Sequence, residues 1–404
     1  MELVRPAGRR SPKVLSVVAM NHSVNDGFVY LLSSLFPVVL TLFGLSVFQV
    51  GILVGVGYLV SVVGQPIVGR YSERVEPKKL LAVGIATMAL SVFTFVLSTG
   101  FYSLLASVLL LRVGSCFYHP VGVSAVSQAY SGPSLDRAMG IQSAFGNLGI
   151  LLVFVFAAPA YLALGWKATF ILFGLVGVAD VAITLAVLKS SSSVAPPQPD
   201  TGPQSRNRYR LGLPLFFLGS MFVSGASFAV VLNYANILLQ SEYHLGVFLT
   251  NIVVSGWIVF AFVGAISTGR LPRFMRRSMF LSLVFLLSAA TIMVISFASL
   301  GLILAVPLLC VNGFTLSSTY PLTYSELSDY LEASPETKGR SFGLIFSAQT
   351  IGGSALGLLA GYLSTTYGLS SAFIVSGLLM LFGSGMAFAW AKKGKKQMVE
   401  TVMV

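Results

Sequence analysis

Asp26 and His22 stand one helical turn apart inside a long apolar stretch near the start of the chain, with Asn25 beside them. Side chains four residues apart on a helix share a face. A charged group inside a bilayer costs at least about 2.5 kcal/mol, so an ionisable residue there indicates function. Proton coupling or substrate contact is one interpretation of Asp26, and local hydrogen bonding to Asn25 and a neighbouring helix is the other. Asp180, in a later apolar stretch, we interpret as a buried, hydrogen-bonded aspartate.

A second set of chemically capable residues lies further along, where Arg112, Ser115 and His119 share a helical face. Arginine does not deprotonate in proteins, so Arg112 requires an anion or a polar cavity. A purely structural ion pair is the alternative to substrate binding. His119 precedes Pro120, which bends a helix and frees a backbone carbonyl. His119 could therefore relay protons, or it could cap that carbonyl.

Neutral polar residues form stripes on two later apolar stretches. Interhelical hydrogen bonds of under about 1 kcal/mol each are one explanation, and a substrate cavity is the other. The stripes consist of Ser220, Ser224 and Ser227, and of Asn312, Thr315, Thr319 and Glu326. The candidate substrate-binding residues are Asn25, Arg112, Ser115, Ser224, Ser227, Asn312, Thr315 and Thr319. The candidates for proton coupling are Asp26, His22, His119 and Glu326.

Several other chemistries are excluded. Three histidines and the isolated Cys116 and Cys310 offer no ligand pair at usable spacing along the chain, so we expect no metal site. The sequence has no phosphate-binding G-x-x-x-x-G-K-[ST] loop, no nucleophile elbow and no metalloprotease motif. We therefore expect neither an enzyme nor a bound cofactor. ATP-driven transport is excluded by the same absence, so uphill transport would have to use an ion gradient.

Long apolar helices must position all these side chains. Of 404 residues, 55% are hydrophobic and only 9% are charged, against about 25% charged in a soluble domain. A helix needs about 20 apolar residues to cross a bilayer. We therefore predict an all-α membrane protein with twelve transmembrane helices, near residues 14–40, 46–69, 79–98, 102–128, 140–163, 168–189, 211–238, 246–268, 279–299, 301–328, 341–364 and 370–391.

The net charge of +12 follows the predicted topology. Of the 25 basic residues, 23 fall in alternate connections and at the two ends, whereas Lys167 alone falls in the opposite set and Arg112 lies within a span. Cytoplasmic loops carry such an excess of lysine and arginine. We therefore expect a multi-pass plasma-membrane protein with both termini in the cytoplasm, a monomer, and no nucleic-acid partner. The first apolar stretch is too long for a cleaved signal peptide.

The chain divides into two similar halves. A proline- and serine-rich linker at residues 189–210 separates residues 1–188 from 211–404, which we predict to be two six-helix bundles. The halves match at an offset of 200 to 203 residues: Phe28 with Phe228, Leu45 with Leu245, Gly69 with Gly269, Pro120 with Pro321, Arg137 with Arg340, Gly165 with Gly368 and Phe170 with Phe373. Six spans each give a parallel repeat, which favours a binding site at the bilayer midplane between the halves.

These features resemble the major facilitator superfamily. The loop from Gly69 to Lys79, which contains Glu73 and Arg74, is similar to that superfamily's loop between helices two and three. The resemblance implies gating roles for Gly69, Glu73, Arg74, Arg137 and Arg340, and it implies an Arg112–Asp26 pair. Within the superfamily, the chain resembles the fosmidomycin-resistance type of efflux protein in four motifs: His22-x-x-Asn25-Asp26, Gln65-Pro66-x-x-Gly69, Phe117-Tyr118-His119-Pro120, and Glu326 followed by Arg340 and Gly343.

The sequence thus predicts a secondary transporter that works by alternating access. The small-molecule substrate and protons are its expected partners, and the resemblance implies export of small organic molecules or drugs. Two alternatives stay open. One is proton-coupled uptake of a small organic anion, with Arg112 as its anchor. The other is a transporter-like receptor that moves no solute.

Overall fold

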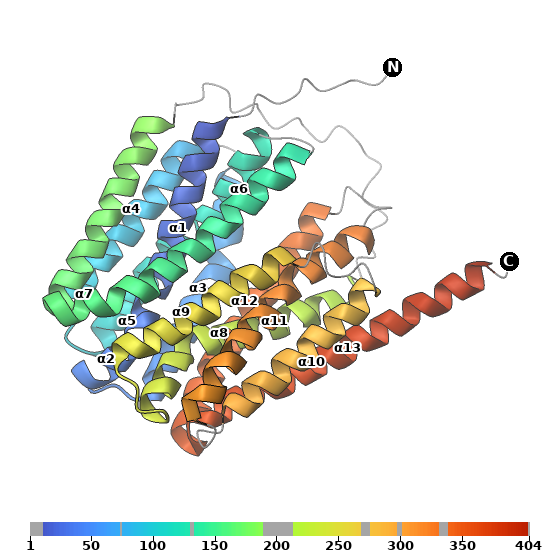
Figure 1. Cartoon of the computed structure of the whole chain (residues 1–404). Coiled ribbons are helices and arrows are strands. Elements are labelled where there is room, and N and C mark those ends of the chain that lie inside the picture. Colours follow the sequence, from blue (N-terminus) through green and yellow to red (C-terminus); the bar gives the residue numbers. More distant parts are fainter. Residues whose placement is uncertain are drawn as a thin grey trace. The chain divides into compact units, whose positions relative to one another are not determined.

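The computed structural model describes residues 11–72, 75–129, 133–188, 213–267, 275–296, 301–330 and 338–402, and this part of the chain is helical without any strand. The linker at 189–210 lies outside it. The helices of the first half are α1 (Pro12–Ser34), α2 (Phe36–Leu42), α3 (Val47–Tyr71), α4 (Pro77–Thr94), η1 (Phe95–Leu97), α5 (Phe101–Ser115), α6 (Tyr118–Ala129) and α7 (Pro133–Val187) (Figure 1). Those of the second are α8 (Leu215–Ser241), α9 (Val247–Ser267), α10 (Arg277–Ile295), α11 (Gly301–Tyr330), α12 (Lys338–Tyr367) and α13 (Ser370–Val402).

The number of membrane spans agrees with the sequence. Ten helices in the described ranges are long and apolar enough to cross a bilayer, and the pair α1 and α2, bent by 46°, makes an eleventh span. One of the ten, Ala144–Val187, is 44 residues long. Its backbone leaves the helical region at Gly165, so it is two helices joined end to end. The ten helices, the bent pair and the additional span that results from dividing Ala144–Val187 make the twelve predicted spans.

Three breaks in the first half follow from proline and glycine. The short α2 begins next to Pro37, where a missing N–H and a ring clash end the preceding helix. The break between α5 and α6 falls at Cys116 and Phe117, and the carbonyl of Cys116 is the one that the ring of Pro120 would meet. Gly165 has φ +76°, a conformation that costs little only for glycine.

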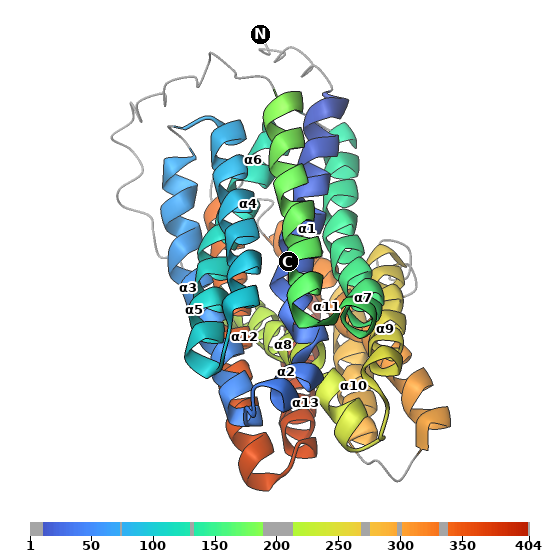
Figure 2. The ribbon, with the colours of Figure 1, turned by 90° about the vertical axis from the view of Figure 1, so that its left-hand side faces the viewer.

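By contact, the chain divides into two compact units. Unit 1 comprises Met1–Leu35 and Val60–Arg210, and unit 2 comprises Phe36–Leu59 and Leu211–Val404. The expected division by chain order, into 1–188, 189–210 and 211–404, stays a prediction, and the contacts differ from it in the placement of Phe36–Leu59. In unit 1, α1 and α4 both pack along α7, as the two views show (Figures 1 and 2). In unit 2, α8 packs along α12 and α9 along α11.

Glycines explain why the first part of α3 groups with unit 2. A Cβ on Gly51 would lie 2.7 Å from the Cα of Gly361, so the two backbones touch. The Ser354 hydroxyl donates a hydrogen bond to the carbonyl of Gly55 at 2.8 Å. The Gly353-x-x-x-Gly357-x-x-x-Gly361 face of α12 therefore packs against α3.

Candidate functional site

Helices α1 and α7 approach each other unusually closely, and glycines on α7 permit it. A Cβ on Gly149 would collide with the backbone carbonyl of Ser23. The Ser23 hydroxyl donates to the carbonyl of Phe145 at 2.6 Å. At Gly146, a Cβ would lie 2.7 Å from both Asp26 Oδ2 and His22 Nε2. These glycines let the polar side chains of α1 lie directly against the backbone of α7.

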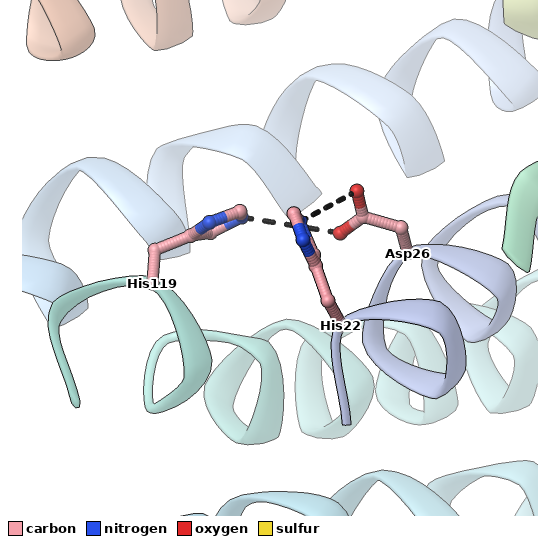
Figure 3. A group of neighbouring side chains, drawn as sticks. All are labelled: His22, Asp26 and His119. Carbon is pink, nitrogen blue, oxygen red and sulfur yellow. Dashed lines mark ion pairs between the residues drawn. The ribbon is translucent and has the colours of Figure 1, made fainter. Parts of the chain in front are cut away.

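Three ionisable side chains meet beside this contact, and we call them the His22–Asp26–His119 cluster (Figure 3). His22 Nε2 lies 3.2 Å from Asp26 Oδ2 within α1. His119 Nε2, from the first turn of α6, lies 3.9 Å from Asp26 Oδ1. Asn25 donates its amide hydrogen to Asp26 Oδ1 at 2.8 Å. The carboxylate therefore has one histidine on each oxygen.

The exposed fraction of the three side chains increases from His22 through Asp26 to His119. The His22 side chain is 8% exposed, Asp26 is 21% exposed and His119 is 45% exposed. His22 is covered by the ring of Tyr118, which stacks on it with centroids 4.5 Å apart. His119 packs edge-on against both rings. His119 is therefore the most accessible of the three side chains.

Tyr118 and Gln142 contact His22 or each other in the site, but the sequence did not identify them as functional candidates. His22 Nδ1 lies 2.6 Å from the backbone carbonyl of Gln142. Tyr118 donates its hydroxyl hydrogen to Gln142 Oε1 at 2.8 Å. Tyr118 adjoins His119 in the quoted motif, so its position was a usable signal. Gln142 carried none, because it acts on His22 through a backbone carbonyl 120 residues away.

The cluster could also hold a metal ion by its geometry. His22, Asp26 and His119 each offer one ligand atom, and these atoms lie within 4.8 Å of one another. Our expectation of no metal site considered distances along the chain only, whereas α6 folds back onto α1, and it stays a prediction. Two imidazoles and one carboxylate are a common set of metal ligands.

Arg112 and Ser115 lie at the end of α5, and both are buried. Ser115 and Cys116 donate to the carbonyl of Arg112, each at 3.0 Å, which satisfies backbone groups at the break before α6. Among the described residues, His22 and His119 form ion pairs with Asp26. The Arg112–Asp26 pair that the resemblance implied stays a prediction.

The polar stripes of the second half make hydrogen bonds between helices. Asn312 is fully buried, accepts a hydrogen bond from Trp257 Nε1 at 3.0 Å and donates to Ser288 Oγ at 3.1 Å. The Ser224 and Thr319 hydroxyls lie 2.7 Å apart. Thr315 donates to the carbonyl of Val311 at 3.0 Å.

The remaining candidates of unit 2 are Ser227 and Glu326. The Ser227 hydroxyl is buried and finds no hydrogen-bond partner in the described ranges. Glu326 accepts a hydrogen bond from Trp390 Nε1 at 3.0 Å. The indole of Trp390 cannot become charged, whereas both histidines beside Asp26 can be protonated.

The gating candidates lie at or near the ends of the described ranges. Gly69 lies near the end of α3, and its carbonyl accepts a hydrogen bond from Ser72. Glu73 and Arg74 lie outside the described residues. Arg137 is in α7 and Arg340 is in α12, and the description of these two does not extend to their side chains.

Asp180 is hydrogen-bonded and buried, as expected. Asn21 donates its amide hydrogens to Asp180 Oδ1 at 2.8 Å and to Thr184 Oγ1 at 2.9 Å. This contact joins α1 to the second part of α7. The opposite side of α1 contacts the first part of α7 through His22 and Ser23.

Comparison with known proteins identifies the family. The family model of the Major Facilitator Superfamily matches residues 18–356 and 216–401. The chain belongs to the Major Facilitator Superfamily. The fosmidomycin resistance protein of Escherichia coli (strain K12) is 22% identical to it over 385 residues, 93% of each chain. The MFS-type transporter YfnC of Bacillus subtilis (strain 168) is 24% identical over 366 residues, 88% of each chain.

Solved structures support the superfamily fold. A bacterial homologue of the human lysosomal transporter Spinster, in an inward-facing and occupied conformation, is similar with a TM-score of 0.77 and 14% identity, over 93% of this chain and 96% of that one. The chain is therefore a multi-pass membrane protein with the fold of superfamily transporters, and it is suited to secondary transport of small molecules. The sequence resemblance to this superfamily, and to the fosmidomycin-resistance type within it, is confirmed.

Proposed function

We propose that this protein exports small organic molecules in exchange for protons, as a secondary active antiporter that works by alternating access. The observation that carries the proposal is the His22–Asp26–His119 cluster, in which a partly buried carboxylate lies between two imidazoles. The export direction is supported by the overall similarity to the fosmidomycin resistance protein of Escherichia coli. Drugs are therefore a candidate substrate class.

The charge of the cluster explains why a proton is the proposed coupling ion. With both histidines neutral and Asp26 ionised, the cluster carries one negative charge. One added proton makes it neutral, and a net charge within a membrane helix bundle is strongly disfavoured. The cluster therefore favours one bound proton when water is excluded and releases it when water enters. A transporter that opens alternately to the two sides would use this difference to couple proton movement to substrate movement.

Substrate binding is assigned to the candidates from the sequence. Asn25, Arg112 and Ser115 lie in the same unit as the cluster, and Ser224, Ser227, Asn312, Thr315 and Thr319 lie in unit 2. Asn25 is the most direct link to coupling, because its amide already donates to Asp26 Oδ1. A substrate that competes for this amide would change the stability of the Asp26 carboxylate. Glu326 is the reserve candidate for proton coupling.

The proposed gate is the loop from Gly69 to Arg74 together with Arg137 and Arg340. Glu73 could pair with basic residues only when the cytoplasmic side is closed. Glu73→Gln should therefore slow transport and leave substrate binding within a few-fold. Loss of binding with normal gate closure would contradict this role.

We further propose a plasma-membrane location with both termini in the cytoplasm, supported by the distribution of basic residues. Cysteines introduced at Ser191 and Ser334 should react with an impermeant reagent only from the cytoplasm, and one at Thr366 only from outside. Labelling of Ser191 from outside would contradict the topology.

The central test uses the purified protein in liposomes with an internal pH indicator. A panel of solutes, with fosmidomycin among them, is added under an imposed pH difference. A solute that moves against its gradient while protons move the opposite way supports antiport. Movement of an organic anion together with protons would favour uptake anchored by Arg112, which is buried and retains its charge. Absence of both across the panel would favour the receptor.

A further inference from the structure

The ring nitrogens of His22 have different surroundings, and this difference fixes where its hydrogen lies. Nδ1 is 2.6 Å from the carbonyl oxygen of Gln142. A carbonyl can only accept a hydrogen bond, so Nδ1 must carry hydrogen. Nε2 then faces Asp26 Oδ2 at 3.2 Å with a lone pair whenever His22 is neutral. Two acceptors at this distance repel each other unless a proton lies between them.

The surroundings of His22 hold it in this orientation. Tyr118 is 2% exposed, its ring stacks on the imidazole at an interplanar angle of 21°, and its hydroxyl donates to the side chain of Gln142 at 2.8 Å. Tyr118 thus contacts both the histidine and the residue that accepts its hydrogen. On the remaining side, Gly146 leaves no room for the ring to swing towards α7. A ring flip that exchanged Nδ1 and Nε2 would break the Gln142 hydrogen bond.

We propose that Tyr118 and Gln142 are positioning residues that hold His22 in the tautomer with hydrogen on Nδ1. The lone pair of Nε2 is thereby directed at Asp26 Oδ2, 3.2 Å away. The fixed ring makes these two atoms the place where the cluster would hold a proton.

The titratable groups that face His22 come from its own helix and from α6. Asp26 faces it from its own helix, and Tyr118 and His119 face it from α6. On α7, Asp180 is bound to Asn21, on the other side of α1. Among these groups, Asp26 alone contacts His22 Nε2 in an ion pair.

This inference deepens the proposed function, but its test does not require transport. The chain contains only three histidines, so the full-length protein labelled with ¹⁵N at histidine gives a spectrum in which each ring can be followed. His244→Gln removes the signal of the loop histidine and His22→Gln identifies that of His22. Nitrogen shifts distinguish the two neutral tautomers directly. All samples contain a chelator, because a metal on the cluster would remove hydrogen from Nε2.

In the wild-type protein, neutral His22 should carry hydrogen on Nδ1 alone. Tyr118→Leu removes both the stacking and the hydroxyl, and it should give a mixture of the two tautomers. Tyr118→Phe keeps the stacking and should give a smaller shift in the same direction. The matched control is Tyr234→Phe, which removes another buried hydroxyl that donates to a backbone carbonyl, that of Gly357 in unit 2, and should leave His22 unchanged.

Hydrogen on Nε2 in neutral wild-type His22 would overturn the inference, and so would an unchanged tautomer in folded Tyr118→Leu. If Tyr118→Leu does not fold, the wild-type tautomer and the Tyr118→Phe shift still decide. A confirmed tautomer together with transport that ignores the pH gradient would reject the proposed coupling and leave the positioning role standing.

Discussion

The two halves of the chain place different side chains on corresponding positions of the same scaffold. At an offset of 200 to 201 residues, the pairs are His22 and Phe222, Asn25 and Gly225, Asp26 and Ala226, and His119 and Tyr320. The first half thus has a carboxylate between two imidazoles where the second has an alanine and two aromatic residues. Close helix packing at this place does not require charge. The charges of the first half are therefore better explained by function than by stability.

The backbones of the two halves make similar close contacts where the side chains differ. A Cβ on Gly149 would collide with the carbonyl of Ser23, and a Cβ on Gly352 would collide with that of Phe222, one residue before the counterpart of Ser23. Gly165 and Gly368 have φ +76° and +88°. The repeat found in the sequence therefore extends to helix contacts and to individual turns.

Exchange of the carboxylate should have the largest effect. Asp26→Asn imitates the permanently protonated form, so it should still exchange substrate without a gradient but lose transport driven by a pH difference down to the level of empty liposomes. Glu326→Gln changes a carboxylate of the other half, hydrogen-bonded to an indole, and should retain most of that transport. The measurement is solute accumulation under an imposed pH gradient. Normal uphill transport by Asp26→Asn, with loss in Glu326→Gln, would transfer the coupling site to the second half.

Gly146→Ala should disturb the cluster and spare the fold. Its Cβ would meet Asp26 Oδ2 and His22 Nε2, which are the ends of side chains and can move aside. The two groups would separate, so coupling should weaken while the thermal unfolding midpoint changes little. Coupled transport and thermal unfolding are measured on the same preparation. An unfolding midpoint that falls as much as that of Gly149→Ala would contradict this. It would show that the side chains of Asp26 and His22 cannot move aside unless the backbone moves too.

Gly149→Ala and Gly352→Ala should both lower stability, because each new methyl meets a backbone carbonyl that cannot move alone. Overpacking of this kind costs about 1–3 kcal/mol. The matched control is Gly385→Ala in α13, where a Cβ meets nothing within 4 Å and helix propensity favours alanine. Unfolding in detergent by heat or denaturant measures the difference. Similar losses in the first two variants would support equivalent packing in the two halves, and a loss in one alone would contradict it.

The smallest effect is expected at Gly44 and its counterpart His244, which have φ +61° and +54°. An alanine at Gly44 should cost about 1 kcal/mol, because a Cβ is disfavoured in this conformation. His244→Gly removes that strain and adds the greater flexibility of glycine in the unfolded chain, so the two changes nearly cancel. Stability measurements on both variants test whether the turn needs the same backbone in both halves. A large loss in His244→Gly would indicate a side-chain role for His244.

Most of the fold followed from the sequence, and the site followed only in part. Apolar stretches and basic loops predicted the spans, and Pro120 predicted the break before α6, because hydrophobicity and proline geometry act locally. The helical spacing placed His22 and Asp26 on one face. The approach of His119 to Asp26 depends on how α6 packs on α1, which spacing along the chain does not encode. The contribution of Gln142 was invisible because a backbone carbonyl leaves no mark on the residue type.

The single-residue connection at Gly165 has a mechanical consequence. The first part of α7 contacts α1 through His22, Ser23 and Gly146, and the second part contacts it through Asp180. Because no flexible loop connects the two parts, one part cannot move along α1 while the other stays in place. Helix α1 and both parts of α7 should therefore move together as one rigid body. The contacts of His22 and Ser23 with α7 would then be preserved throughout a transport cycle.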